Sequence, residues 1–294
     1  MKEVVVLSGK GGTGKTSIAA SFAALAQSKV LVDCDVDAAD LHLLLDPHPS
    51  LSQRERVRER HEFWSGQVAF IGKENCTECG LCQEVCRFGA IKDYVVDEIS
   101  CEGCELCPQI CPVDAITMQP CMAGHWFISD TRYGTLVHAR LGIAEENSGR
   151  LVTLVRNNAR LIAEKGALDY IISDGPPGIG CPVIASLSGA NLALLVTEPT
   201  LSGIHDLERV IGVCRHFGIP ALICINKYDI NEENSCRIEN YCHKEGIEIA
   251  SKIPFDNVVT EAIVRGMPVV EYSNNKVTQE IKELWQIVSL KLDK

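Results

Sequence analysis

An eight-residue segment near the start of the chain constrains the fold more strongly than any other feature of the sequence. Residues 9–16 have the sequence GKGGTGKT and fit the pattern GxxxxGKS/T, in which glycines let backbone N–H groups turn toward phosphate oxygens. The apolar run 4–7 precedes this loop, the alanine-rich stretch 17–27 follows it, and a second apolar run spans residues 30–32. These patterns predict a strand, a loop, a helix and a second strand. The segment therefore predicts an α/β domain that binds a nucleotide.

The loop supplies most of the groups that we expect to bind the phosphates: Gly9, Lys10, Gly11, Gly12, Thr13, Gly14, Lys15 and Thr16. Lys15 would neutralise the β- and γ-phosphates, and the Thr16 hydroxyl would bind Mg²⁺. The positive end of the following helix dipole adds to the attraction for phosphate. ATP and Mg²⁺ are therefore the ligands that the sequence predicts for this loop.

The α/β pattern resumes after about residue 151. Strand-like apolar runs occur at residues 170–173, 192–197, 221–225 and 249–253. Helical stretches separate or follow them at residues 154–165, 205–217, 233–244 and 278–292. An alternation of this kind predicts an α/β fold with a mostly parallel sheet that is covered by helices.

The chain contains 15 cysteines, and most of them lie between residues 68 and 121. Because 15 is an odd number, a framework in which every cysteine is paired in a disulfide is excluded. The spacing C-x2-C-x2-C-x3-C occurs twice, and Pro112 follows the second copy. The two copies consist of Cys76, Cys79, Cys82 and Cys86, and of Cys101, Cys104, Cys107 and Cys111.

This duplicated spacing is that of bacterial ferredoxins with two [4Fe–4S] clusters. Three ligands of each cluster then come from one copy, and the fourth comes from the other copy. The two expected ligand sets are Cys76, Cys79, Cys82 and Cys111 for the first cluster, and Cys101, Cys104, Cys107 and Cys86 for the second. Zinc is the alternative, but zinc sites usually combine two CxxC pairs separated by a longer stretch.

The cysteine-rich segment interrupts the α/β pattern, so the sequence predicts a discontinuous organisation. Residues 1–47 and 122–294 would form a P-loop ATPase domain, residues 48–67 a connector, and residues 68–121 a small inserted α+β ferredoxin-like domain. Acidic side chains outnumber basic ones in the cysteine-rich segment. This excess would suit a basic redox partner, although a solubilising surface is the more common reason for it.

Composition argues against several classes of partner and location. The net charge of −11 disfavours nonspecific nucleic-acid binding, so no nucleic-acid partner is expected. No apolar run approaches the roughly 18 to 20 residues of a transmembrane helix, and the run 4–7 is too short for an export signal. We therefore expect a cytoplasmic protein without a stable membrane anchor, in which clustered cysteines bind metal.

The last helical stretch could be a membrane-binding or a core-packing helix. Its apolar side chains are accompanied by few basic residues, which favours packing against the core. These apolar side chains are Val277, Ile281, Leu284, Trp285 and Val288.

Several motifs together resemble the deviant Walker A ATPases, a family that includes MinD, ParA, Mrp and the nitrogenase iron protein. Lys10 is an additional lysine within the phosphate loop and resembles the signature lysine of that family. The resemblance implies that Lys10 reaches across an ATP-bound dimer to the nucleotide of the partner. It therefore implies a homodimer upon ATP binding, or a heterodimer with a related ATPase.

The same resemblance implies roles for acidic residues at two strand ends. Asp35 would bind Mg²⁺ and orient the attacking water, with Asp33 as the second candidate, and Asp174 would contact Mg²⁺ through water. Acidic residues at the carboxyl ends of parallel strands face the ligand crevice of such a sheet. The implied catalytic residues are Lys10, Lys15 and Asp35.

Two later segments resemble the part of the family's site that holds the adenine base. Asn226 and Lys227 follow the run 221–225, and the resemblance implies that Asn226 hydrogen-bonds the base. Pro254 corresponds to a loop that lines the adenine pocket.

The combination resembles a subgroup of MinD/Mrp-like ATPases with an inserted ferredoxin domain. It implies ATP hydrolysis, slow without a partner, that is coupled to electron transfer through two [4Fe–4S] clusters. An iron–sulfur or metallocluster assembly or carrier ATPase is the alternative, and a positioning or regulatory switch similar to MinD or ParA is a third. No CxxC pair lies outside the repeats, although Mrp-type scaffolds carry one. The implied partner is a redox protein or a protein that receives a cluster.

Seven cysteines lie outside the two repeats, and we expect most of them to pack as small apolar side chains. Cys224, inside a strand-like run, is the clearest case. Whether Cys121 or Cys181 binds an additional cluster is left open by the sequence.

Overall fold

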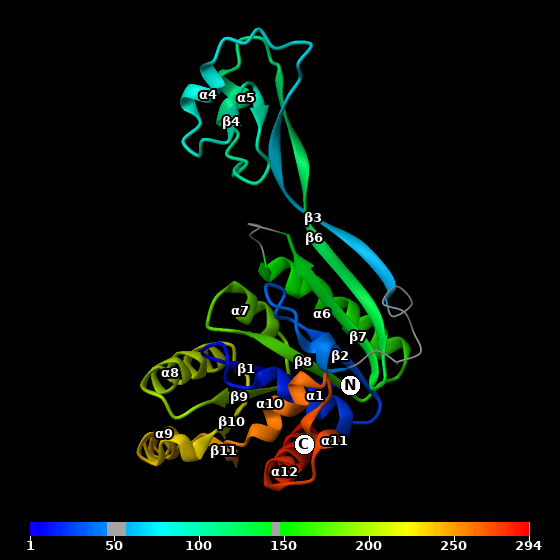
Figure 1. The fold of residues 1–294 in the computed structure, drawn as a ribbon, viewed down its shortest axis with the longest axis vertical. Helices are drawn as coiled ribbons and strands as arrows, with labels where there is room; N and C mark the ends of the chain where they lie inside the picture. The colour runs from blue at the N-terminus through cyan, green and yellow to red at the C-terminus, as the bar shows by residue number, and fades with distance from the viewer. Residues whose placement is uncertain (46–56, 143–147, 294) are drawn as a thin grey trace. The chain divides into compact units, whose positions relative to one another are not determined.

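The computed structural model describes residues 1–45, 57–142 and 148–293. It consists of two compact units (Figure 1). The first unit comprises Met1–Arg60, Trp126–Arg140 and Ser148–Lys294, and the second comprises His61–His125 and Leu141–Asn147. The first unit is therefore interrupted in sequence by the second, and both cysteine repeats lie in the second unit.

A mostly parallel sheet forms the centre of the first unit (Figure 1). The order begins with β11 (Glu248–Ile253), β10 (Ala221–Asn226), β9 (Leu192–Thr197), β1 (Lys2–Ser8), β8 (Tyr170–Pro177), β2 (Lys29–Asp33) and β7 (Gly134–Leu141). Every neighbouring pair in this series is parallel. The strands β6 (Ile116–Thr131) and β3 (Val57–Ile71) complete the order. The predicted α/β class and mostly parallel sheet are confirmed.

Helices cover both faces of this sheet, because successive strand residues point to opposite faces and both sets are apolar (Figure 1). In β1, Val4 and Val6 pack on one face, whereas Val5 and Leu7 pack on the other. The first face carries α1 (Lys15–Leu25), α2 (Leu41–Leu44), α10 (Asn257–Val264), α11 (Val269–Tyr272) and α12 (Lys276–Leu292). The second face carries α7 (Cys181–Leu187), α8 (Leu201–His216) and α9 (Glu232–Glu245). The helix α6 (Ser148–Lys165) packs beside α7 and β2, and the 3₁₀ turn η1 (Tyr228–Ile230) follows β10.

The final helix α12 packs into the core, as its sequence predicts. Val277, Ile281, Leu284 and Val288 are buried, and the Trp285 ring lies 5.0 Å from the ring of Phe22 in α1. No helix among the described residues is long and apolar enough to cross a membrane.

The second unit repeats its own structure in the way that its sequence repeats. Each copy of the cysteine spacing carries its third cysteine on a short helix, Cys82 on α4 (Leu81–Val85) and Cys107 on α5 (Leu106–Ile110). The short strands β4 (Ile91–Lys92) and β5 (Val95–Val96) pair in antiparallel fashion between the two copies. Ile91 and Ile116 follow the two copies at equivalent positions, and both are buried in one small core. The two copies therefore share a single core.

Part of the expected connector, residues 48–67, is a strand and not a loop. Residues 57–67 form the first part of the long strand β3, and residues 46–56 lie outside the described residues. The charged side chains 58–62 are exposed, while Phe63 and Ser65 alternate inward. A run of alternating charges is typical of a loop in sequence. It is also compatible with a strand whose side chains face water.

Candidate functional site

The phosphate loop lies between β1 and α1 and depends on two glycines with left-handed backbone. Gly12 has a φ of 80° and Gly14 a φ of 95°, in the region that L-residues avoid. Gly14 also precedes α1 directly, and its carbonyl accepts a hydrogen bond from the Ile18 N–H at 3.2 Å. A Cβ atom at position 14 would lie 2.5 Å from Asn226 Nδ2. The glycine is therefore required by both the backbone conformation and its neighbour.

Lys15 and Asp174 form the buried centre of the site. Lys15, the first residue of α1, is 6% exposed, and Asp174 of β8 is 1% exposed. Burial raises the pKa of Asp174 to about 7, although the nearby Lys15 ammonium and a hydrogen bond with Thr16 both lower it. One oxygen, Asp174 Oδ1, is buried without a hydrogen-bond partner in the described part of the chain. A buried carboxylate beside a threonine hydroxyl suits a hydrated Mg²⁺, so the residues fit this ion.

The two aspartates after β2 have different surroundings. Asp33 is fully buried, and its two oxygens accept hydrogen bonds from the N–H groups of Asp35 and Leu41, each at 3.1 Å. Both oxygens of Asp33 thus hold the turn that follows the strand. Asp35 is only half-buried. Burial raises its pKa above the ordinary value, and the positive charge of Lys15 partly offsets this rise. Asp33 therefore supports the turn that carries Asp35, and the role of Asp35 in binding Mg²⁺ and orienting water stays a prediction.

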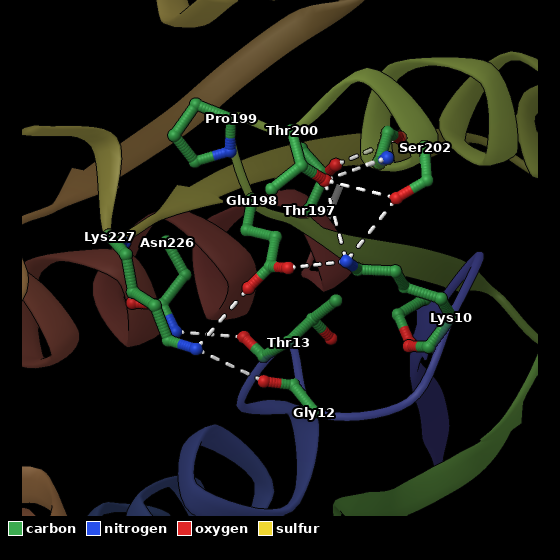
Figure 2. A network of polar contacts seen from close by, with 12 residues as sticks. Lys10, Gly12, Thr13, Thr197, Glu198, Pro199, Thr200, Ser202, Asn226 and Lys227 are labelled. Carbon is green, nitrogen blue, oxygen red and sulfur yellow. Dashed lines mark hydrogen bonds and ion pairs between the residues drawn. The ribbon is translucent and has the colours of Figure 1, made fainter. Parts of the chain in front are cut away.

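Lys10 is held within its own chain by residues that follow β9. Figure 2 shows its ammonium facing Glu198, with Nζ 2.6 Å from Glu198 Oε1. The hydroxyls of Thr200 and Ser202 lie 3.4 Å from the same Nζ. Glu198 lies in the segment 196–200, which also resembles the family, but that resemblance implies no contact between Glu198 and Lys10, which are far apart in the chain.

Asn226 and Lys227, which follow β10, also contact the phosphate loop (Figure 2). Asn226 Nδ2 donates to the Thr13 carbonyl at 2.8 Å, and Lys227 Nζ donates to the Gly12 carbonyl at 3.2 Å. Lys227 Nζ also lies 3.3 Å from Glu198 Oε2. The pair therefore supports the loop, and a role in binding adenine stays a prediction.

Pro254 lies at the same edge of the sheet, directly after β11. The following N–H, of Phe255, donates to Asp229 Oδ1 at 2.7 Å. This bond joins the loop after β11 to the 3₁₀ turn after β10. Phe255 is 50% exposed, so an apolar ring is available at this edge.

Eight cysteines line two separate cavities in the second unit. The first cavity is lined by Cys76, Cys79, Cys82 and Cys111, and the second by Cys86, Cys101, Cys104 and Cys107. Each cavity thus takes three cysteines from one repeat and one from the other, in the same division as the expected ligand sets. The remaining lining of the first cavity is mainly apolar, that of the second also includes Glu102 and Glu105, and each cavity has a volume of about 20 Å³.

The cysteine side chains of the described residues are not gathered around a single point. A tetrahedral zinc site holds thiolates about 2.3 Å from the ion, so the sulfurs crowd together. Among the described residues, no three His, Cys, Asp or Glu side chains gather closely enough for that. Backbone N–H groups already point at sulfur, from Ala115 to Cys111 Sγ at 3.3 Å and from Glu78 to Cys76 Sγ at 3.4 Å. Hydrogen bonds of this kind are a feature of iron–sulfur ligation.

The cysteines outside the repeats are mainly core residues, as expected. Cys34, Cys214, Cys224 and Cys242 are fully buried. Burial also raises the pKa of their thiols, to about 11 for Cys214 and Cys242. Uncharged buried thiols of this kind are unreactive and pack as apolar groups.

We expect Gly14→Ala to destabilise the protein by about 1–3 kcal/mol, because the new Cβ meets Asn226 and the backbone is left-handed. Urea unfolding without nucleotide measures this loss. Gly11→Ala is the matched control, since nothing lies within 4 Å of a Cβ there. Its expected effect is below about 0.5 kcal/mol. Equal losses in the two variants would contradict the geometry of the loop.

Asp174 should destabilise the protein at alkaline pH. Its pKa in the folded chain is about 7, above the ordinary 3.8, so the folded state binds the proton more tightly than the unfolded chain does. The stabilising effect of this proton is complete below about pH 4 and is lost as the pH rises through 7. We therefore expect Asp174→Asn to raise the melting temperature at pH 8 but hardly at pH 4. The exposed Glu233→Gln is the control, and a loss of stability at pH 8 would contradict the prediction.

Comparison with known proteins agrees with this geometry. The CobQ/CobB/MinD/ParA nucleotide binding domain family matches residues 4–269. An uncharacterized protein of Methanocaldococcus jannaschii, MJ0578, is 35% identical over 288 residues, which is 97% of this chain and 95% of that protein. An iron-sulfur cluster carrier protein of Pyrococcus horikoshii is 29% identical over 133 residues, 40% of this chain and 44% of its own length.

The fold is also that of solved structures. The septum site-determining protein MinD of Pyrococcus horikoshii, complexed with Mg-ADP, superimposes with a TM-score of 0.57 at 19% identity, over 98% of this chain and 95% of that one. The match to the family extends over most of the sequence, from β1 to α11. The chain therefore belongs to the CobQ/CobB/MinD/ParA family of nucleotide-binding proteins.

Proposed function

We propose that this chain is a Mg²⁺-dependent ATPase that couples a nucleotide-dependent dimer switch to electron transfer through two [4Fe–4S] clusters. The observation that carries the proposal is the division of eight cysteines between two cavities, in a chain that also has a phosphate loop. When bound, the clusters would supply one-electron carriers. The remaining roles in the proposal belong to residues of the chain itself.

The ATPase half of the proposal uses the residues at the carboxyl ends of the parallel strands. Lys15 neutralises the β- and γ-phosphates, Thr16 and Asp174 hold hydrated Mg²⁺, and Asp35 orients the attacking water. Lys10 reaches the nucleotide of the partner, which makes the active site complete only in a homodimer, or in a heterodimer with a related ATPase. Positioning and charge neutralisation supply most of the catalysis in such sites.

Coupling between the ATPase site and the cysteine sites would begin with residues 37–43, which follow Asp35. Within the first unit this segment lines a cavity of about 800 Å³ together with β6 and β7. Its Asp40 and His42 lie on one side, and Ser129 and His138 lie on the other, joined at 2.9 Å between Oγ and Nε2. The cavity gives the segment room to move when the γ-phosphate binds near Asp35.

The strand β6 carries this movement along the chain. It contributes Ser129 to the cavity and begins at Ile116, next to Ala115, whose N–H donates to Cys111 Sγ at 3.3 Å. A change of conformation in the segment after Asp35 therefore has a continuous strand through which to act. We take this strand as the route by which nucleotide binding would affect the cysteine sites.

A cluster carrier is the second candidate, because the partial relatives include iron-sulfur cluster carrier proteins. An electron-transfer protein keeps its iron during turnover, whereas a cluster carrier gives it up to another protein. Clusters that are reduced and reoxidised without loss of iron support electron transfer. Transfer of iron and sulfide to an apo-protein supports the carrier. A nucleotide-dependent positioning switch similar to MinD would need neither behaviour.

The division of the cysteines can be tested with a double variant. We expect anaerobically reconstituted wild-type protein to hold about eight irons, and Cys76→Ala/Cys111→Ala to hold about four, with the second set intact. If each repeat held a site of its own, this variant would damage both sites. Iron and sulfide analysis with EPR of the reduced protein measures the outcome.

The control removes an exposed cysteine that lines neither cavity, Cys236→Ala, and should keep about eight irons. Zinc in place of iron after strictly anaerobic purification would contradict the cluster assignment. Loss of iron from the control variant as well would contradict the division.

The coupling is tested in Asp35→Asn, which should bind ATP but not hydrolyse it. We expect ATP to convert this variant to a dimer and to change the EPR spectrum or the potential of the reduced clusters. ADP is the control ligand and should do neither. Identical cluster potentials and an unchanged oligomeric state with and without ATP would contradict the proposed coupling.

A further inference from the structure

Glu198 has an unusual position for an acidic residue, because it lies among the basic groups that a phosphate would bind. Its two oxygens face two lysines, with Lys10 Nζ 2.6 Å from Oε1 and Lys227 Nζ 3.3 Å from Oε2 (Figure 2). Lys227 also donates to the Gly12 carbonyl within the phosphate loop. One carboxylate thus pairs with two ammonium groups at the edge of the candidate ATP site, and the three side chains together carry one positive charge.

Glu198 is ionised in this position. Partial burial alone would raise its pKa, but hydrogen bonds from Lys10 and Lys227 lower it below the ordinary value. Its side chain is 15% exposed and that of Lys10 is 31% exposed, so water screens the pair only in part. The ion pair is therefore present at neutral pH.

The backbone that carries Glu198 is held firmly. Its carbonyl accepts a hydrogen bond from the Thr200 N–H at 2.8 Å, and Pro199 restricts the next residue. Thr200 in turn caps α8, with its hydroxyl accepting from the Gly203 N–H at 3.0 Å. Because this backbone stays in place, Lys10 has to leave the carboxylate in order to reach an anion beyond the span of the Glu198 side chain.

We propose that Glu198 is an internal competitor of ATP, which holds Lys10 in its own subunit until a nucleotide phosphate replaces the carboxylate. This inference rests on the proposed ATP-dependent function and adds a residue that sets its threshold. A triphosphate attracts both lysines and is repelled by Glu198, so binding exchanges one set of ion pairs for another. The chain therefore binds ATP less tightly than it would if the two lysines were not already paired with Glu198.

The competition has a further consequence for dimer formation. Lys10 is released only when phosphate binds nearby, so a subunit without a nucleotide keeps Lys10 paired with Glu198. Glu198 therefore links release of Lys10 to occupancy of the site. Thr200 and Ser202, whose hydroxyls also face Lys10, provide weaker neutral acceptors that cannot replace the carboxylate.

The test measures binding of a fluorescent ATP analogue to the full chain at low ionic strength. We expect Glu198→Gln, which keeps the shape and removes the charge, to bind about three- to tenfold more tightly than the wild type. In a Lys10→Met background the same substitution should raise the affinity clearly less, because only the contact of Glu198 with Lys227 and its direct repulsion of phosphate then remain. A higher salt concentration should reduce the difference in affinity between Glu198→Gln and the wild type.

Two further variants make the result decisive. Glu233→Gln removes a carboxylate from an exposed ion pair with Arg237 on α9 and should leave the affinity unchanged. Glu198→Asp keeps the charge but withdraws it by one methylene, and should show a smaller effect in the same direction as Glu198→Gln. It also serves if Glu198→Gln fails to fold.

Weaker or unchanged binding by folded Glu198→Gln would overturn the inference and leave the proposed function standing. An equal gain in the Lys10→Met background would overturn it as well. A wild-type chain that binds no ATP analogue would overturn the proposed function, and the inference with it.

Discussion

The carboxyl ends of the central parallel strands meet at one edge of the sheet, and the rest of the candidate site depends on that convergence. β1 ends in the phosphate loop, β2 in Asp33, and β8 contains Asp174. β9 and β10 are followed by Glu198 and by Lys227. Because these strands are parallel, their backbone hydrogen bonds bring residues from distant parts of the sequence to the same edge of the sheet. The loop conformation, the buried charges and the ion pairs all follow from this arrangement.

The parts of the fold that can be predicted from sequence are those with a local physical signal. The strands β1, β8, β9 and β10 appear as uninterrupted apolar runs because both of their faces are buried, and the glycines of the phosphate loop mark its strained turn. The strand β6 escapes prediction because it spans Pro120 and Gly124, and the charged start of β3 resembles a loop. Mixed exposure along these two strands removes the simple alternation on which such predictions depend.

The candidate site shows the same limit. Cysteine spacing encodes which four residues can surround one cavity, so the two sets follow from the order of cysteines along the chain. The contacts of Glu198 with Lys10 and of Asn226 with Thr13 have no such local signature, because each joins segments about 190 to 210 residues apart. Long-range pairs of this kind are determined by sheet topology, which single-sequence patterns do not contain.

The exchange of the fourth cysteine between repeats also has a consequence for the order of events during synthesis. The first cavity contains Cys76, Cys79, Cys82 and Cys111, so a nascent chain that ends before Cys111 cannot complete it. The second cavity needs Cys86, which is made earlier than its other three lining cysteines. Both cavities therefore become complete within a few residues of each other on the growing chain. Neither set of four lining cysteines is therefore complete until the chain has been made as far as Cys107.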